Sequence, residues 1–241
     1  MIDWMYIFKT LAMLGTGRTD FDLSLRSHKG RADSRHAGVY GGGAWGGFGL
    51  RAGLLYAKHG IETERAIAFP GVIDRTDARF DGHTRQAVIE TGYHFNRHAW
   101  ELEPFLQYAH VRVKHEAIDE AGGDAALSAP ATSGKVNLAT AGLRFAANLR
   151  GSRQEQTWLS LRGMLGYRRA SGDRTPATDL AFADSDAFNV RGAPIADGSV
   201  LVEAGIAARL SARALLELGY SGQLADEARD HGANARISWQ F

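Results

Sequence analysis

Two short patterns contain residue types that bind phosphate or attack carbonyl carbon. Gly41, Gly43 and Gly46 have the G-x-G-x-x-G spacing in which glycine amides approach a dinucleotide. That role requires a strand, a tight turn and a helix, whereas the flanks here alternate like two strands joined at residues 45–47, so we expect glycines that let strands bend or leave space. Ser221 lies in GYSGQ, which is not the G-x-S-x-G elbow of serine hydrolases. The sequence therefore predicts no catalytic residue and no enzyme activity in this chain.

The residue types that bind metal ions are also poorly arranged. His94 and His98 are four residues apart but straddle an expected turn, and no H-E-x-x-H pattern accompanies them. Asp184 and Asp186 lack the spacing and the glycine of a calcium-binding EF-hand loop. The sequence contains 0 cysteines, which excludes thiolate zinc sites and fits a protein of the bacterial envelope. We expect neither a metal nor another cofactor.

The dominant signal is alternation of apolar and polar residues with a period of two, which predicts β-strands. In the final segment the apolar face and the polar face consist, respectively, of His231, Ala233, Ala235, Ile237, Trp239 and Phe241, and of Gly232, Asn234, Arg236, Ser238 and Gln240. Comparable alternation occurs in residues 48–56, 87–95, 100–108, 139–145, 159–168, 200–209 and 214–223, and more weakly in residues 20–28 and 36–45. This gives roughly ten strands, within the size range of membrane barrels.

The connections and the aromatic residues follow a second regularity. Short turns near residues 45–47, 95–99 and 210–213 alternate with long loops near residues 60–82, 116–135 and 172–197, as periplasmic turns and extracellular loops do in membrane barrels. Rings near strand ends would form the two interfacial girdles. These rings are Tyr56, Tyr93, Trp100, Tyr108, Tyr167 and Tyr220, with Trp239 and Phe241 at the chain end.

Composition limits the alternatives. Mean hydropathy is −0.25 with 29 glycines, and no stretch approaches the roughly 18 to 20 apolar residues of a membrane-spanning helix. A net charge of +1 gives no support for nucleic-acid binding. A soluble β-sandwich or lipocalin-like barrel also alternates, but here glycine mixes with arginine and glutamate on the polar face, which favours a wet lumen. We therefore predict an all-β chain that folds as an antiparallel up-and-down transmembrane β-barrel.

Several ordered phrases, together with the C-terminal end, resemble the autotransporter β-domain, the outer-membrane translocator of type V secretion. They are GVYGGGAWGGFGLRAG, AVIETGYHF, WELEPFLQYAHV, TAGLRF, LVEAGI, LLELGYSGQ and ANARISWQF. The resemblance covers residues 20–241, which we assign to the barrel domain. It implies a Gram-negative cell outer membrane location and a barrel that delivers an N-terminal passenger to the cell surface with a helix threading its pore. Such barrels have twelve strands, so the first two strands and the pore helix have no clear counterpart here.

Residues 1–19 form an atypical segment, either a residual strand or a non-native start. Residues 1–14 have an apolar middle but neither a basic start nor a small-residue cleavage site, so they do not read as a signal peptide. We expect an upstream start or a fragment of a longer chain.

Two sets of residues follow from placing the alternation in such a barrel. Charged residues of the polar face would line the pore, where they must pair with one another or meet water and a threaded segment. They are Arg51, Glu90, Glu103, Arg144, Arg162, Glu203, Arg209, Glu217 and Arg236. The C-terminal alternation of Ile237, Trp239 and Phe241 resembles the insertion signal read by the barrel-assembly machinery, and it also suits any outward-facing last strand.

The leading functional hypothesis is a monomeric translocator, in truncated form if the missing strands are absent from the whole protein. Its partners would be outer-membrane lipid, the barrel-assembly machinery and a covalently linked passenger, with no nucleic acid. Two alternatives stay open: a surface adhesin or outer-membrane barrel enzyme that acts through its long loops, or a non-functional remnant of a larger autotransporter. Protease or esterase activity would then belong to a passenger outside this sequence.

Overall fold

The computed structural model describes residues 7–23, 28–69, 72–97, 100–150, 157–211, 213–226 and 229–239. These residues fold into antiparallel strands joined by turns and loops. The long strands are β1 (Ile7–Leu23), β2 (His28–Trp45), β3 (Phe48–Phe69), β4 (Val72–Tyr93), β6 (Trp100–His115), β10 (Thr132–Arg150), β11 (Thr157–Gly172), β14 (Gly198–Arg209), β15 (Ala214–Leu224) and β16 (Arg229–Trp239). The short strands are β5 (Phe95–Arg97), β7 (Ile118–Asp119), β8 (Ala121–Gly122), β9 (Leu127–Ala129), β12 (Ala177–Phe182) and β13 (Phe188–Arg191).

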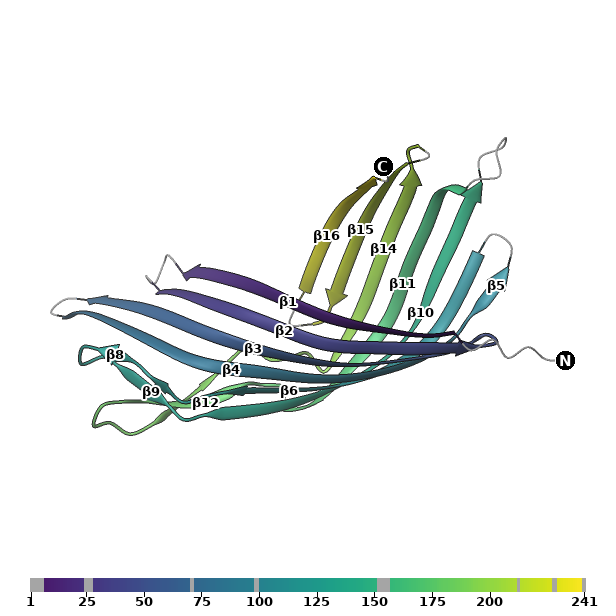
Figure 1. Cartoon of the computed structure of the whole chain (residues 1–241). Helices are drawn as coiled ribbons and strands as arrows, with labels where there is room; N and C mark the ends of the chain where they lie inside the picture. The colour runs from purple at the N-terminus through teal and green to yellow at the C-terminus, as the bar shows by residue number, and fades with distance from the viewer. Residues whose placement is uncertain are drawn as a thin grey trace.

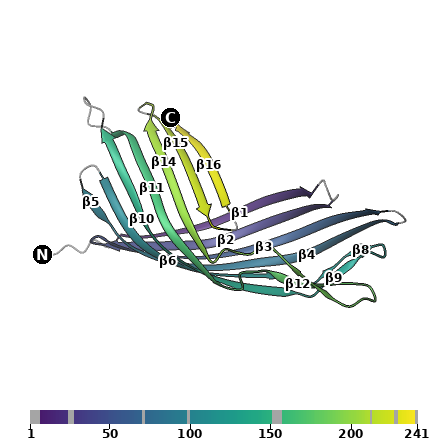
Figure 2. The same cartoon turned by 180° about the vertical axis from the view of Figure 1, so that it is seen from behind.

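The long strands lie side by side in chain order and form one curled sheet, as the alternation predicted. Figures 1 and 2 show this sheet as a trough, with β1 to β4 forming one wall and β11 to β16 the other. Within the described residues β1 pairs only with β2 and β16 only with β15, so the sheet is a half-barrel with two free edges. Short turns lie at one end of the strands, and long connections and a small second sheet lie at the other (Figure 1).

Alternation assigns the two faces of the sheet. Side chains such as Leu54, Leu106 and Leu165 are 61%, 61% and 60% exposed, and they project from the convex face. Glu90 and Thr140 are buried on the concave face. Directly opposed residues of antiparallel strands share a face, so the pairing of Arg51 with Glu90 continues this division from strand to strand. The apolar face therefore points outward, as a membrane barrel requires.

The structure corrects the expected loop at residues 60–82. Residues 60–69 continue β3 and residues 72–82 continue β4, and the two extensions pair with each other. The convex face of β3 and β4 changes from apolar to charged beyond Tyr56, with Lys58 Nζ 2.6 Å from Asp81 Oδ2 and Arg79 Nε 3.2 Å from Glu62 Oε1. Opposite charges across neighbouring strands stabilise a sheet as apolar pairs do, so the strands extend beyond the apolar band.

Three other expectations are refined. The long connections near residues 116–135 and 172–197 contribute β7, β9, β12 and β13, which pair in a second sheet in the order β13-β12-β9-β7. The weak strand expected at residues 20–28 overlaps the end of β1 and residues 24–27, which lie outside the described part of the chain. The boundary expected between residues 19 and 20 falls within β1, whose 17 residues all pair with β2.

The buried interior is thin, because a single curved sheet has no second layer against most of its concave face. Its most buried apolar side chains are small or lie on the concave wall, as Ala57, Ala78, Phe105 and Ala109 do. No helix in the described ranges is long and apolar enough to cross a membrane. Stability must therefore come mainly from strand pairing and from polar contacts along the wall.

Candidate functional site

Four charged side chains from four different strands meet on the concave wall. Arg51 Nη1 of β3 lies 2.7 Å from Glu90 Oε1 of β4 and 2.6 Å from Glu103 Oε1 of β6. From β10, Arg144 Nη2 lies 2.7 Å from Glu90 Oε2, and its Nη1 lies 3.3 Å from Glu103 Oε1. We call this set the charge cluster. Each carboxylate contacts both guanidinium groups, so the cluster links strands that are far apart in the sequence.

The charge cluster balances two positive with two negative charges. The side chains of Glu90 and Glu103 are only 8% and 11% exposed, so their ionised form depends on these partners. Gln107 donates a further hydrogen bond to Glu90 at 2.8 Å. The guanidinium carbon of Arg144 lies 3.8 Å from the centre of the Phe105 ring, a cation–π contact. The cluster thus braces the wall without a net charge.

A second polar group lies on the same face closer to the C-terminal edge. It surrounds a hollow of about 740 Å³ whose lining includes Arg144, Arg162, Glu203, Glu217 and Arg236. Arg162 Nη2 lies 3.4 Å from Glu217 Oε1, and Arg236 is directly opposite Glu217 in the strand register.

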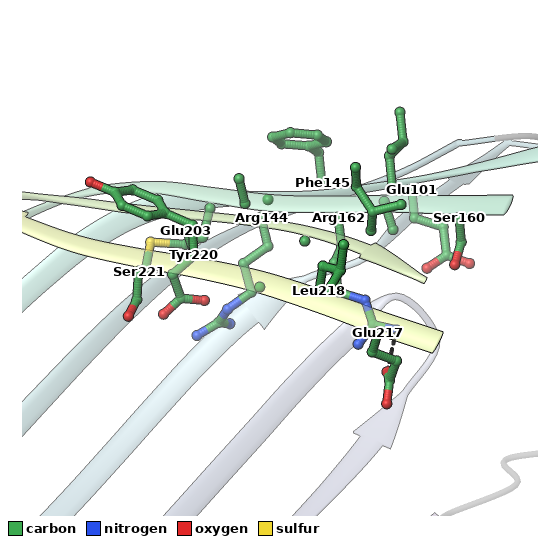
Figure 3. A pocket seen from close by; sticks show the side chains of 18 of the residues that line it. Glu101, Arg144, Phe145, Ser160, Arg162, Glu203, Glu217, Leu218, Tyr220 and Ser221 are labelled. Atoms are coloured by element: carbon green, nitrogen blue, oxygen red, sulfur yellow. Dashed lines mark hydrogen bonds and ion pairs between the residues drawn. The ribbon is translucent and has the colours of Figure 1, made fainter. Parts of the chain in front are cut away.

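The side chains around this hollow separate by face. Figure 3 shows Arg144, Glu217 and Ser221 on one side of the ribbons, with Phe145 and Tyr220 on the other. Unlike the charge cluster, this group is largely exposed, and its charges face the open trough.

One of the nine charges predicted to line a pore, Arg209, lies on the same face but apart from both groups. Arg209 stands opposite Leu215 near the end of β14 and is exposed, and the hollow's lining does not include it. The structure therefore brings four of the nine predicted residues into one cluster. Four more residues, together with Glu103 and Arg144 of that cluster, surround one hollow. Their role as pore-lining residues stays a prediction.

The convex face carries the predicted aromatic residues at two levels. Tyr93 and Trp100 lie at the short-turn end, and Tyr56, Tyr108, Tyr167 and Tyr220 lie further along their strands towards the long connections. All six are exposed. On the last strand, Ile237 and Trp239 are 70% and 63% exposed beside the free edge of β16, while Phe241 lies outside the described residues.

A carboxylate clamp holds the small second sheet against the long β3–β4 hairpin. Glu120 accepts hydrogen bonds from Arg65 Nε, Thr76 Oγ1 and the Leu127 amide, each at 3.0 Å. Thr76 is 1% exposed, and β8 pairs with β4 beside it. This clamp fixes the connection between β6 and β10 at the open end of the trough.

His59 lies on the concave side above the apolar band. Its Nδ1 is 2.8 Å from Ser34 Oγ and its Nε2 is 3.1 Å from Thr84 Oγ1. Burial, followed by the neighbouring His36 and His83, lowers the pKa of His59 below its ordinary value. These surroundings therefore favour the neutral form of the ring.

Comparison with known proteins places this architecture in a family. The profile of the family described as Autotransporter beta-domain matches residues 10–221. Two curated relatives, both named "Extracellular serine protease" from Serratia marcescens, are 34% and 33% identical over 230 residues, which cover 95% of this chain. The chain belongs to the autotransporter β-domain family. This membership makes it an outer-membrane translocator domain of a Gram-negative bacterium.

The part of each Serratia relative that this chain matches is only 22% of the length of that relative. Among solved structures, the translocator domain of the autotransporter NalP from Neisseria meningitidis superposes with a TM-score of 0.71 at 14% identity. The superposition covers 97% of this chain and 76% of the NalP chain. At this identity the likeness concerns the fold, and it agrees with the antiparallel order described above.

The patterns considered for chemistry occupy ordinary places in the autotransporter fold. Gly41 and Gly43 lie within β2, and Gly46 lies in the turn to β3 with a φ of 61°, so strand, turn and strand replace the strand, turn and helix of a phosphate site. Ser221 stands opposite Glu203 on the concave wall, whereas His231 contacts the Tyr220 hydroxyl on the other face.

The structure describes some of the histidine and aspartate residues that were considered as metal ligands. His98 lies outside the described residues, and Asp184 and Asp186 are exposed in a connection. In the part of the chain that the structure describes, no three histidine, aspartate or glutamate side chains are grouped to hold a metal ion.

Sequence reasoning missed three structural features of the domain. Phe105 and Met164 are apolar but face inward, where one contacts Arg144 and the other lines the hollow. Phe105 is two residues from Glu103, and Met164 is two residues from Arg162. Residues two apart on a strand share a face, so the alternation could have indicated this orientation. The Glu120 clamp had no local signal, because Arg65 is 55 residues away in the sequence.

Proposed function

We propose that this domain supports the export of a covalently linked passenger, with the concave polar face as the wall of the export path. The observation that carries the proposal is the position of the charge cluster and the 740 Å³ hollow on one continuous concave face. Charges neutralised within the wall leave a polar but weakly attractive surface, past which an unfolded chain can move without strong binding. The pore-lining set predicted from the sequence is the set of residues that would contact this chain.

We further propose that the domain inserts as a monomer through the barrel-assembly machinery. The free edge of β16 supports this proposal, since its backbone groups can pair with another sheet edge while Ile237 and Trp239 face lipid. The insertion signal would comprise these two residues and Phe241. The outward apolar face would contact outer-membrane lipid on insertion.

The domain itself is proposed to have no enzymatic activity, and its passenger is proposed to be a secreted serine protease. The name shared by the two Serratia relatives supports this choice of passenger, and their greater length leaves room for a protease outside the matched part. Placement of Ser221 and His231 on opposite faces argues against hydrolysis by this chain. A serine-hydrolase probe should label the whole secreted protein upstream of this domain and leave the domain unlabelled.

The decisive experiment compares two adjacent positions on opposite faces. A photo-crosslinking amino acid is placed at Ser221, whose side chain lies on the concave side, or at Tyr220, whose side chain projects from the convex face. For this experiment the domain is fused to a signal peptide and to a tagged passenger that stalls during export. Crosslinking at Ser221 should capture the passenger, and crosslinking at Tyr220 should not. Protease added to intact cells should remove the tag, because the tagged end of the passenger has reached the cell surface. Capture at both positions, or only at Tyr220, would contradict export along the concave face.

A further inference from the structure

The strand register places positive side chains directly opposite one another on the convex face. Arg85 of β4 is opposite Arg112 of β6, and Arg112 is opposite Lys135 of β10. In the next row, Arg35 of β2 is opposite Lys58 of β3. Lys58 is opposite His83 of β4, which in turn is opposite Lys114 of β6. The six Arg and Lys residues of these two neighbouring rows are together called the cationic row: Arg35, Lys58, Arg85, Arg112, Lys114 and Lys135.

The cationic row lies where the apolar band ends on the side of the long connections. Tyr56 is opposite Arg85, and Leu54, two residues earlier on the same face, is exposed. An interfacial tyrosine marks the level of lipid headgroups in membrane barrels. The row is therefore at the height at which phosphate groups of the outer leaflet would lie.

Within the residues that the structure describes, five of these six cations lack the ion-pair partners that other outward charges have. Among the described residues, the ion pair between Lys58 and Asp81 at 2.6 Å is the one salt bridge that a side chain of the row makes. Asp173 Oδ2 accepts a hydrogen bond at 2.9 Å from the backbone amide of Lys135. The Arg112 Nε is buried and has no hydrogen-bond partner in the described part of the chain. Like charges directly opposite on a sheet destabilise it, and a buried unpaired donor adds to that cost. The arrangement calls for anions from outside the protein.

Charges further from the band, on the same convex face, behave differently. Asp20, Arg31, Glu62 and Arg79 follow one another in register across β1 to β4 with alternating sign. Arg31 Nε lies 3.0 Å from Asp20 Oδ1, and Arg79 Nε lies 3.2 Å from Glu62 Oε1. Charges of one sign are thus opposite one another only locally, in the cationic row, and not over the whole extended part of β1 to β4.

An apolar hollow adjoins the cationic row on its membrane side. It has a volume of about 660 Å³, and its lining includes Ala37, Leu54, Tyr56, Arg85 and Ala87. Small side chains at Ala37 and Ala87 leave this space between larger neighbours on the convex face. The volume and the largely apolar lining of the hollow suit a hydrocarbon chain attached to a headgroup that Arg85 contacts.

We propose that the cationic row and this hollow form a binding site for a phosphorylated glycolipid of the outer leaflet, the lipid A part of lipopolysaccharide. Guanidinium and ammonium groups donate charge-assisted hydrogen bonds to its phosphates, and one acyl chain occupies the hollow. Bound phosphates relieve the repulsion between Arg85, Arg112 and Lys135. The site would anchor the domain on its convex face and is independent of export along the concave face.

The test measures binding of diphosphoryl lipid A to the refolded full chain in detergent. Each Lys or Arg near an anionic lipid surface contributes about fivefold to affinity, so R85Q/R112Q/K135Q should weaken binding about 100-fold. The matched control R31Q/R75Q/R79Q removes the same charge from residues that are paired with acids, and it should change affinity less than about threefold. Dephosphorylated lipid A should bind the wild type as weakly as diphosphoryl lipid A binds the triple variant.

A stability measurement distinguishes loss of the site from loss of the fold. In detergent without lipid A, R85Q/R112Q/K135Q should unfold at a higher urea concentration than the wild type, because repulsion is removed. With lipid A present, the order should reverse. Equal affinity of the triple variant and the wild type would overturn the proposal, as would equal binding of dephosphorylated lipid A or of phosphatidylglycerol micelles. Competition by inorganic phosphate at the concentration that lipid A requires would also overturn it, since it would make the site one for free phosphate.

Discussion

Arg144 is the side chain whose removal tests the charge cluster most directly. Arg144→Met keeps much of the stem that packs on Phe105 but removes the guanidinium that donates to Glu90 at 2.7 and 3.0 Å and lies 3.3 Å from Glu103. Breaking a buried ion pair costs about 3 to 5 kcal/mol. Arg51 still contacts both carboxylates and Arg144 itself is 32% exposed, which roughly halves that cost, whereas the lost cation–π contact adds about 1 kcal/mol. We expect a loss of about 2.5 to 3.5 kcal/mol.

The assay is equilibrium urea unfolding in lipid vesicles, followed by tryptophan fluorescence, with the m-value as a check on the transition. Arg162→Met is the matched control, because its side chain is 61% exposed and its contact with Glu217 is 3.4 Å long. That change should cost less than about 0.5 kcal/mol. Equal losses in the two variants would refute the distinction between a braced cluster and an exposed pair.

A double variant measures the coupling between Arg144 and Glu90. Arg144→Met combined with Glu90→Gln removes one charge of each sign and should recover part of the loss, with a coupling energy of about 1 to 2 kcal/mol. Strictly additive losses would mean that Arg144 acts through packing alone and not through the carboxylate that it contacts.

Three further predictions concern the orientation, the clamp and the histidine. Leu165→Arg should cost about 2 to 4 kcal/mol in vesicles because Leu165 faces lipid, whereas Met164→Arg should cost less than about 1 kcal/mol, and a reversed order of their urea midpoints would contradict the outward assignment. Glu120→Ala should release the connection around residues 116–131 and raise its hydrogen exchange and its cleavage by added protease at least about tenfold, while unchanged protection would exclude the clamp. Because the folded protein lowers the pKa of His59 from 6.5, the unfolded chain binds the proton more readily, so stability should fall as the pH drops below 6.5. That fall should be smaller in His59→Gln, and an equal pH dependence of the two urea midpoints would assign it to other groups.

The sequence by itself determined the strand character and the identity of the two faces. Side chains on neighbouring positions of a strand point to opposite sides, so the alternation of Leu54 and Leu106 with the cluster residues Arg51 and Glu103 assigns each to a face without any long-range information. The short turns followed for the same local reason, since glycine and polar residues interrupt the alternation. The N-terminal strand was the exception, because residues 11–14 are apolar at successive positions and give no period of two.

Only the tertiary structure decided which charges meet and how far each strand extends. Arg51 and Glu103 are 52 residues apart, and their contact depends on the register of β3, β4 and β6 together, which no local pattern encodes. The hairpin extension beyond Tyr56 and the cationic row depend on the same register, because a one-residue shift would turn every side chain of a strand to the other face. Pairing across strands is a non-local property, and for that reason the two faces could be predicted from the sequence while the charge cluster, the clamp and the cationic row could not.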